Sequence, residues 1–80
     1  MRIDKFLKNS RLIKRRTIAK EACEQDRIFI NDKPAKPGTE VKLDDIIRIQ
    51  FGNSMIKARV KSLSLLTSKE AAETMYEIVD

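Results

Sequence analysis

The 80-residue sequence contains no histidine and no tryptophan, and it has a single cysteine, Cys23. Histidine is the commonest general base and metal ligand, so its absence removes most candidate sites of both kinds. One cysteine can form neither an internal disulfide nor a cysteine-based structural zinc site. The only glycines, Gly38 and Gly52, are too few for a glycine-rich loop that cradles phosphate. These absences argue against an enzyme and predict no metal ion and no cofactor.

Long hydrophobic runs are also missing. No apolar stretch approaches the roughly 20 residues that span a bilayer, and the opening MRIDKFLK carries an acid and does not make a signal peptide. Cys23 falls at an apolar helical position, where a free thiol packs like a small hydrophobic side chain. A reducing cytoplasm is the simplest location for a protein with one unpaired cysteine. We therefore expect one small cytoplasmic domain that does not enter a membrane.

What the sequence does have is positive charge in one place. Residues 1–20 hold eight cations and one acid, a net charge of +7, whereas residues 21–80 carry −2. Like charges repel, so folding gains little from such a block, and phosphate is its usual counterpart. An anionic membrane would favour an amphipathic helix with a long apolar face, which this block lacks. The charge distribution predicts a polyanion-binding surface formed by the first quarter of the chain.

Hydrophobic spacing indicates helices first and strands later, an α+β fold. Residues 3–8 and a segment starting near Thr17 have helical spacing, with Ile18, Ala19, Ala22 and Cys23 as the apolar stripe of the second helix. RIFIN, IIRIQF and SMIKARVKS suit strands of a small, mainly antiparallel sheet on which the two helices pack. Turns are expected at residues 31–32, 44–45 and 52–53.

The C-terminal segment suggests a short additional helix. Thr67 and Glu70 form a capping box, after which we expect about two helical turns. Leu65, Leu66, Ala72, Met75 and Tyr76 would fold back onto the sheet. We accordingly divide the chain into a domain at residues 1–62 and a C-terminal extension at residues 63–80.

The order of these segments resembles the S4 RNA-binding domain. The stretch RRTIAKEACEQDRIFIND followed by VKLDDIIRI carries the resemblance, and its matching positions are Arg16, Ala19, Cys23, Ile28, Ile30, Asn31, Val41, Asp45 and Ile47. Three positions that are glycine in the family are aspartate here: Asp26, Asp32 and Asp44. Aspartate visits the left-handed region at modest cost, so we expect the turns to form.

A closer resemblance covers nearly the whole chain. MRIDKFLKNSRLIKRRTIAKEA, IRIQFG and AAETMYEIV are similar to stand-alone S4 proteins of bacterial ribosome-associated quality control, and more distantly to a heat-shock relative that binds large ribosomal subunits. The resemblance implies a factor that binds obstructed large subunits and stabilises the peptidyl-site tRNA during alanine tailing of the stalled chain. It implies contacts with large-subunit ribosomal RNA and this tRNA, cooperation with an RqcH-type tailing factor, and no catalysis. We expect a monomer.

Within this resemblance, Arg16 matches the RNA-contacting arginine of the family. The predicted RNA-binding residues are Arg2, Lys5, Lys8, Arg11, Lys14, Arg15, Arg16 and Lys20. Asp4 has two possible roles: stabilising the first helical turn through the helix dipole, or orienting Arg2 or Arg16 through a salt bridge. The aromatic residues Phe6, Phe29, Phe51 and Tyr76 all occupy apolar positions. We therefore expect recognition of backbone shape and charge in structured RNA, without base-stacking platforms.

Other functions remain open from the sequence. One is a general heat-shock-like or ribosome-assembly factor that binds ribosomal RNA without a part in tailing. Another is a DNA-binding regulator with a helix-turn-helix, although the second helix offers few side chains that read base edges. A modification enzyme would need a catalytic domain, for which the 80 residues leave no room.

Overall fold

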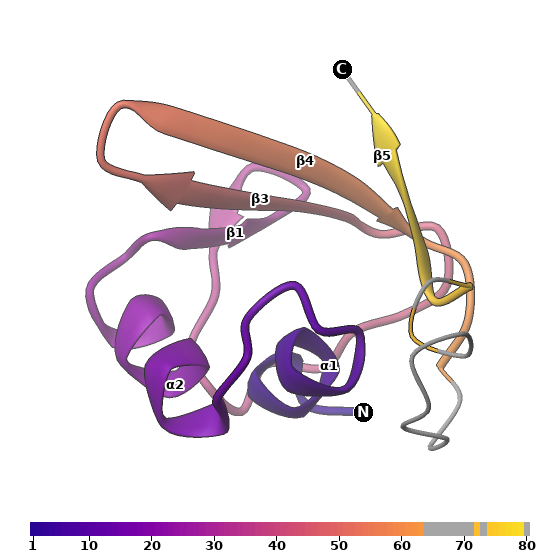
Figure 1. Ribbon diagram of the computed structural model, residues 1–80, viewed down its shortest axis with the longest axis horizontal. Coiled ribbons are helices and arrows are strands. Elements are labelled where there is room, and N and C mark those ends of the chain that lie inside the picture. Colours follow the sequence, from indigo (N-terminus) through magenta and orange to yellow (C-terminus); the bar gives the residue numbers. More distant parts are fainter. Residues whose placement is uncertain (64–71, 73, 80) are drawn as a thin grey trace.

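The computed structural model describes residues 1–63, 72 and 74–79. In this part of the chain, two helices precede a five-stranded sheet, as Figure 1 shows. The elements are α1 (Ile3–Asn9), α2 (Arg16–Glu24), β1 (Ile28–Ile30), β2 (Lys33–Pro34), β3 (Ile46–Phe51), β4 (Ser54–Val60) and β5 (Tyr76–Val79). The predicted α+β class and the two short N-terminal helices are confirmed.

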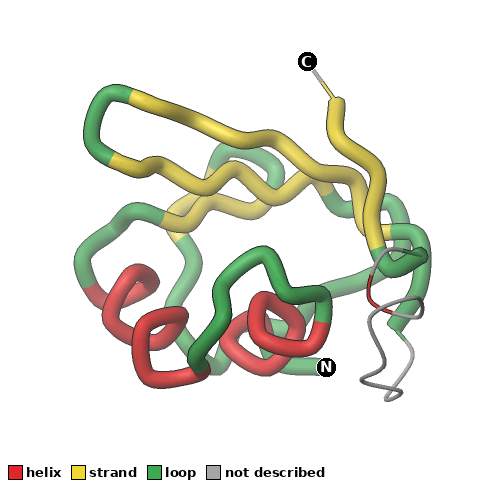
Figure 2. The backbone as a smooth tube through the Cα atoms, viewed as in Figure 1, coloured by secondary structure: helices red, strands yellow, loops and turns green. Residues whose placement is uncertain are grey.

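The helices and the sheet form two layers. The strand order is β2-β1-β3-β4-β5 with antiparallel pairing throughout, and both helices lie on one face of the sheet (Figures 1 and 2). The N-terminus is tied to the segment between β2 and β3, where Arg2 forms an isolated antiparallel bridge with Glu40. None of the described helices covers the opposite face of the sheet, which is called the outer face below.

The core lies between the layers and follows the predicted spacing in α1. Ile3, Phe6 and Leu7 are fully buried there, and α2 contributes Ala19 and Cys23. Strands β3 and β4 add residues from alternate positions, as expected for a sheet with one buried face. The core cluster consists of Ile3, Phe6, Leu7, Ile13, Ala19, Cys23, Ile28, Ile30, Ala35, Val41, Ile47, Ile49, Val60 and Met75.

Five large apolar residues of the described chain are exposed: Ile18, Leu43, Phe51, Met55 and Ile78. Ile18 is 49% exposed, so the apolar stripe of α2 is narrower than predicted. Phe51 is 42% exposed because it pairs with Ser54 at the far end of the β3–β4 hairpin. Leu43 is 58% exposed and lies outside the regular strands. Apolar character at these positions therefore does not indicate core packing.

The turns form where aspartate replaces the family's glycines. Asp26, Asp32 and Asp44 all have positive φ, at 56°, 68° and 70°. Asn31 precedes Asp32 with φ 52°, so two consecutive residues of this turn occupy the left-handed region. Short Asn and Asp side chains tolerate this region better than other non-glycine residues. The three substitutions keep the predicted turns at a modest cost in backbone strain.

The C-terminal residues add a strand that the sequence patterns do not predict. Strand β5 pairs antiparallel with β4, with Ala58 opposite Ile78 and Val60 opposite Tyr76. Met75 is fully buried, which confirms that this residue folds back onto the core. The helix expected after Thr67 falls mainly on residues 64–71 and 73, outside the described residues. The extension at residues 63–80 thus contributes an edge strand to the sheet of residues 28–60, and its division from the domain at 1–62 stays a prediction.

Across the described residues, the helices are too short and insufficiently apolar for any of them to cross a membrane.

Candidate nucleic-acid interface

A buried carboxylate organises the start of the cationic block. Asp4 in the first turn of α1 is only 2% exposed. Its Oδ2 accepts hydrogen bonds from Arg16 Nε at 3.3 Å and Arg2 Nη2 at 3.4 Å, and its Oδ1 accepts one from the Lys5 backbone N–H at 2.8 Å. Arg2 Nε lies 3.3 Å from Oδ1, so this guanidinium contacts both oxygens. The carboxylate therefore has the partners that a buried charge requires.

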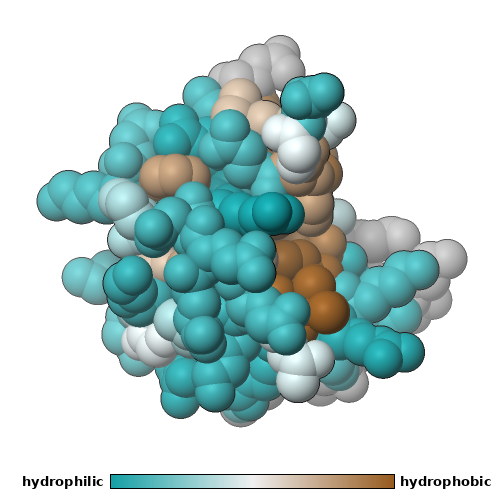
Figure 3. Space-filling view, turned by 90° about the vertical axis from the view of Figure 1, so that its left-hand side faces the viewer, coloured by the Kyte–Doolittle hydropathy of each residue, from teal (hydrophilic) through white to brown (hydrophobic). Residues whose placement is uncertain are grey.

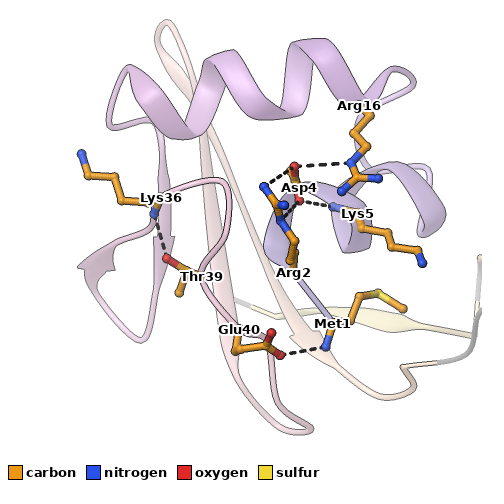
Figure 4. Close-up of polar contacts among 8 residues, drawn as sticks. All are labelled: Met1, Arg2, Asp4, Lys5, Arg16, Lys36, Thr39 and Glu40. Atoms are coloured by element: carbon orange, nitrogen blue, oxygen red, sulfur yellow. Dashed lines mark hydrogen bonds and ion pairs between the residues drawn. The ribbon is translucent and has the colours of Figure 1, made fainter.

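The two arginines keep part of their binding capacity. Figure 4 shows Arg2 and Arg16 converging on Asp4 from different segments of the chain. Their side chains remain 50% and 49% exposed. Arg16 uses Nε for Asp4, and its two terminal amino groups make no hydrogen bond to another described residue. Two positive charges share one negative charge, which leaves a positively charged site with oriented donors for phosphate.

The salt bridge predicted for Asp4 is present, and it involves both arginines. Asp4 also stays in the first turn of α1, so the two roles considered for it coexist. Arg2, Asp4, Arg16, Thr17 and Lys20 line one surface hollow, called the anchored hollow below. Residues 14 positions apart in the sequence thus meet around one carboxylate.

A second hollow, called the open hollow below, is lined by Lys8, Asn9, Arg11 and Lys14. It lies where α1 ends and the connector to α2 begins. Ser10 is buried there, and its hydroxyl donates to the Leu7 carbonyl at 3.2 Å. Arg11 follows with φ 62°, a conformation that favours glycine at the position after a helix. The chain thus has an arginine at a position where the backbone conformation favours glycine.

The eight predicted cations therefore do not share a single hollow. Three surround the anchored hollow and three surround the open hollow. The remaining two, Lys5 and Arg15, line neither. The Lys5 side chain is directed away from Asp4 in Figure 4, and Arg15 is an exposed residue immediately before α2. Contact of these eight residues with RNA stays a prediction.

Helix α2 separates the cationic side from a different surface. Ile18 and Glu21 line a hollow together with Gln25 of the following turn and Phe51 of β3. Figure 3, which looks onto the side of α2, shows a mainly hydrophilic face with a hydrophobic patch to the right of its centre. Glu21 and the pair Arg16 and Lys20 of α2 therefore line two separate hollows.

Cys23 lies beneath this surface and does not form a reactive site. Its side chain is fully buried, as the sequence pattern predicts. Burial, together with the nearby negative charges of Asp4 and Glu24, raises the pKa of the Cys23 thiol to about 11. Because the thiolate is the nucleophilic form, a thiol with this pKa is inert at neutral pH.

A third group of cations, not among the predicted RNA-binding residues, lies on the outer face of the sheet. Arg48 of β3 and Lys57 and Arg59 of β4 line a hollow there. The alternation in IIRIQF and MIKARV could have placed them, since the neighbouring isoleucine and alanine residues face the core. Phe29, one of the aromatic residues at apolar positions, pairs with Arg48 across β1 and β3. Its half-buried ring lies 4.2 Å from the guanidinium carbon of Arg48.

Comparison with known proteins places this architecture in a family. Residues 1–47 match the S4 domain. The chain is 51% identical to the RQC P-site tRNA stabilizing factor of Halalkalibacterium halodurans over 98% of this chain and 89% of that protein. It is 31% identical to the heat shock protein 15 homolog of Aeromonas salmonicida, over 96% of this chain and 59% of that protein.

A solved structure supports the fold independently. The trimeric structure of heat shock protein 15 from Vibrio cholerae superposes with a TM-score of 0.90 over 99% of this chain and 81% of that chain. Its sequence identity to this chain is 24%, so this likeness concerns the fold alone. From the sequence matches and the fold together, the chain belongs to the S4 domain family, and within it to the group whose curated members carry the name RQC P-site tRNA stabilizing factor.

Proposed function

We propose that this protein binds obstructed large ribosomal subunits and stabilises the peptidyl-site tRNA while alanine residues are added to the stalled chain. The proposal is supported by 51% identity to a relative whose name states the P-site tRNA role. Its ligands are large-subunit ribosomal RNA and the tRNA itself, and it acts beside an RqcH-type tailing factor in the cytoplasm. Its role is to bind and position RNA, without a catalytic step of its own.

The pairing of Arg2 and Arg16 through buried Asp4 is the observation that carries this proposal. Structured RNA presents phosphates at fixed positions, and oriented guanidinium groups can bind them with two hydrogen bonds each. Asp4 restricts both side chains before RNA arrives, which lowers the entropy lost on binding. Lys20 adds a cation to the same hollow. This arrangement suits a factor that must hold one RNA geometry through repeated additions.

The experiment compares Arg16→Ala with Arg27→Ala in cells that lack the native protein. Arg27 is an exposed arginine that lines neither the anchored nor the open hollow, so its variant is matched in charge. We expect Arg16→Ala to stop recovery of large subunits carrying peptidyl-tRNA and to abolish alanine tails, whereas Arg27→Ala keeps both. Circular dichroism checks folding. Normal tailing with folded Arg16→Ala would contradict the proposal.

A second candidate function is general binding of ribosomal RNA after heat shock or during assembly. It is favoured by the 31% identity to the heat shock protein 15 homolog. The two functions differ in the subunits recovered. Recovery of vacant large subunits, with tails formed equally well without the protein, would support this second function and exclude the first.

A further inference from the structure

The outer face of the sheet carries a row of cations of its own. Because side chains alternate along a strand, Ile47 and Ile49 face the core while Arg48 faces outward. Lys57 lies directly opposite Arg48 on β4, and Arg59 follows two positions later on the same face. The three cations share a hollow whose lining also includes Asn31, Asp32, Ile46 and Val79.

Folding does not explain this arrangement. Arg48 and Lys57 are direct cross-strand partners, and like charges in such positions destabilise a sheet. An uncovered sheet face tolerates many uncharged polar residues that would avoid this repulsion. As with the N-terminal block, an external negative charge is the simpler reason to keep these residues together.

Arg48 is held in place before any ligand binds. Its Nη1 donates to Asp32 Oδ1 at 3.2 Å, and its guanidinium lies over the Phe29 ring. The Arg48 side chain is 25% exposed, and its buried Nε has no hydrogen-bond partner among the residues that the structure describes. One side of the guanidinium is thus covered by the ring, and its position is restricted. Such a group can bind a phosphate or stack against a base with little further loss of freedom.

The acids on this face leave the cations incompletely neutralised. Glu77 lies 3.5 Å from Arg59 and 4.0 Å from Lys61, so one carboxylate serves two cations. Lys57 forms no ion pair within the described residues. Asp32 is 82% exposed, and ion pairs at such exposure are weak. A phosphate can therefore bind here without first breaking a strong internal contact.

We propose that the outer face binds the sugar–phosphate backbone of a second RNA segment, separate from the one bound by the helical layer. The cations lie in the layer opposite the helices, so one copy of the protein can hold two RNA segments at once. An acidic peptide fits less well, because it has no base that could stack against the Arg48 guanidinium. The inference depends on the proposed function in one respect, namely that the protein binds RNA.

The test is a bridging experiment with two short RNA hairpins. One hairpin is immobilised, the protein is added, and capture of a second, fluorescent hairpin is measured. The variant Lys57→Gln with Arg59→Gln is compared with Lys33→Gln with Lys42→Gln, which removes the same charge from exposed positions outside this hollow. We expect the first variant to keep protein binding to the immobilised hairpin and to lose capture of the second roughly tenfold or more. The control should retain both.

Several outcomes would overturn the proposal. Unchanged capture by the Lys57 and Arg59 variant would mean that bridging uses another surface or a second copy of the protein. An equal loss in the control variant would show a general effect of charge. If the Lys57 and Arg59 variant still bridges the two hairpins but no longer associates with native subunits, the outer face binds a protein partner. Thermal unfolding measurements check that each variant is folded. The bridging experiment does not measure alanine tailing, so its result remains valid even if the proposed function in tailing is wrong.

Discussion

The two cationic hollows on the helical side contain similar charge but hold it differently. In the anchored hollow, the Asp4 carboxylate fixes two arginines. In the open hollow, the lining residues Lys8, Asn9, Arg11 and Lys14 include no carboxylate. A fixed guanidinium can select one phosphate geometry, whereas flexible lysines attract phosphate with little orientation. The comparison teaches that charge density alone does not identify the more specific part of an RNA-binding surface.

The largest effect is expected from Arg16→Ala compared with Lys14→Ala. Both variants lose one positive charge, but only Arg16 is oriented by a buried partner. We expect affinity for purified large subunits to fall roughly 10- to 100-fold for Arg16→Ala, the range for a lost charge-assisted hydrogen bond. Lys14→Ala should fall only a few-fold. Competition binding at fixed salt measures both, and equal losses would mean that the two hollows do not differ.

The next prediction tests whether Asp4 positions the two arginines or only changes the electrostatic attraction of RNA. The variant Asp4→Asn keeps the shape of the side chain and raises the net charge of the protein by one. Electrostatic attraction alone would then tighten RNA binding. We expect affinity to fall roughly three- to tenfold, because Arg2 and Arg16 lose a charged hydrogen-bond acceptor.

Thermal unfolding and RNA binding of Asp4→Asn should be measured together. The free energy of unfolding should fall by about 1–3 kcal/mol, since two guanidinium groups lose their ionic partner. An increase in affinity with normal folding would show that the carboxylate does not position the arginines.

A smaller effect is expected at Arg11 in the open hollow. The variant Arg11→Gly relieves a positive φ that costs about 1 kcal/mol or more, partly offset by the entropy of glycine. We expect an unchanged or slightly higher melting temperature together with a few-fold weaker RNA binding. Arg11→Ala is the matched control, because it removes the charge and keeps the strain. Its affinity should equal that of the glycine variant while its melting temperature is lower.

At neutral pH the smallest effect is expected from the buried Cys23 thiol, because its contribution to stability changes only at alkaline pH. The pKa of Cys23 rises from 9.0 in the unfolded chain to about 11 in the fold. Its contribution to the free energy of unfolding is therefore complete below pH 9 and is lost as the pH rises from 9 to 11. Denaturant unfolding should show this loss relative to Cys23→Ala, which has no thiol to titrate. Parallel pH profiles of the two proteins would contradict burial as the cause.

Local signals predicted much of this fold. The spacing of Ile3, Phe6 and Leu7 marked α1, and aspartate at the family's glycine positions still indicated turns. Both depend on short-range geometry, either helical periodicity or the φ preference of one residue. The order of helices and strands followed from such signals together with the resemblance to the S4 domain.

Features that depend on distant contacts were harder to predict. Strand β5 acquires its structure by pairing with β4, and strand preference depends strongly on such context. The division of the cations into two hollows follows from the chain path between α1 and α2, which spacing in the sequence does not encode. The salt bridge of Asp4 was predicted only as one of two roles, because the sequence cannot show that Arg2 and Arg16 reach the same carboxylate.

The short edge strand β2 has a consequence for how copies of this protein can associate. It has only two residues, and one of them is Pro34, whose nitrogen carries no hydrogen to donate. An approaching strand would find no continuous row of backbone donors and acceptors along this border, which is how natural sheets resist growing into one another. Any assembly of several copies therefore has to use a surface other than this edge.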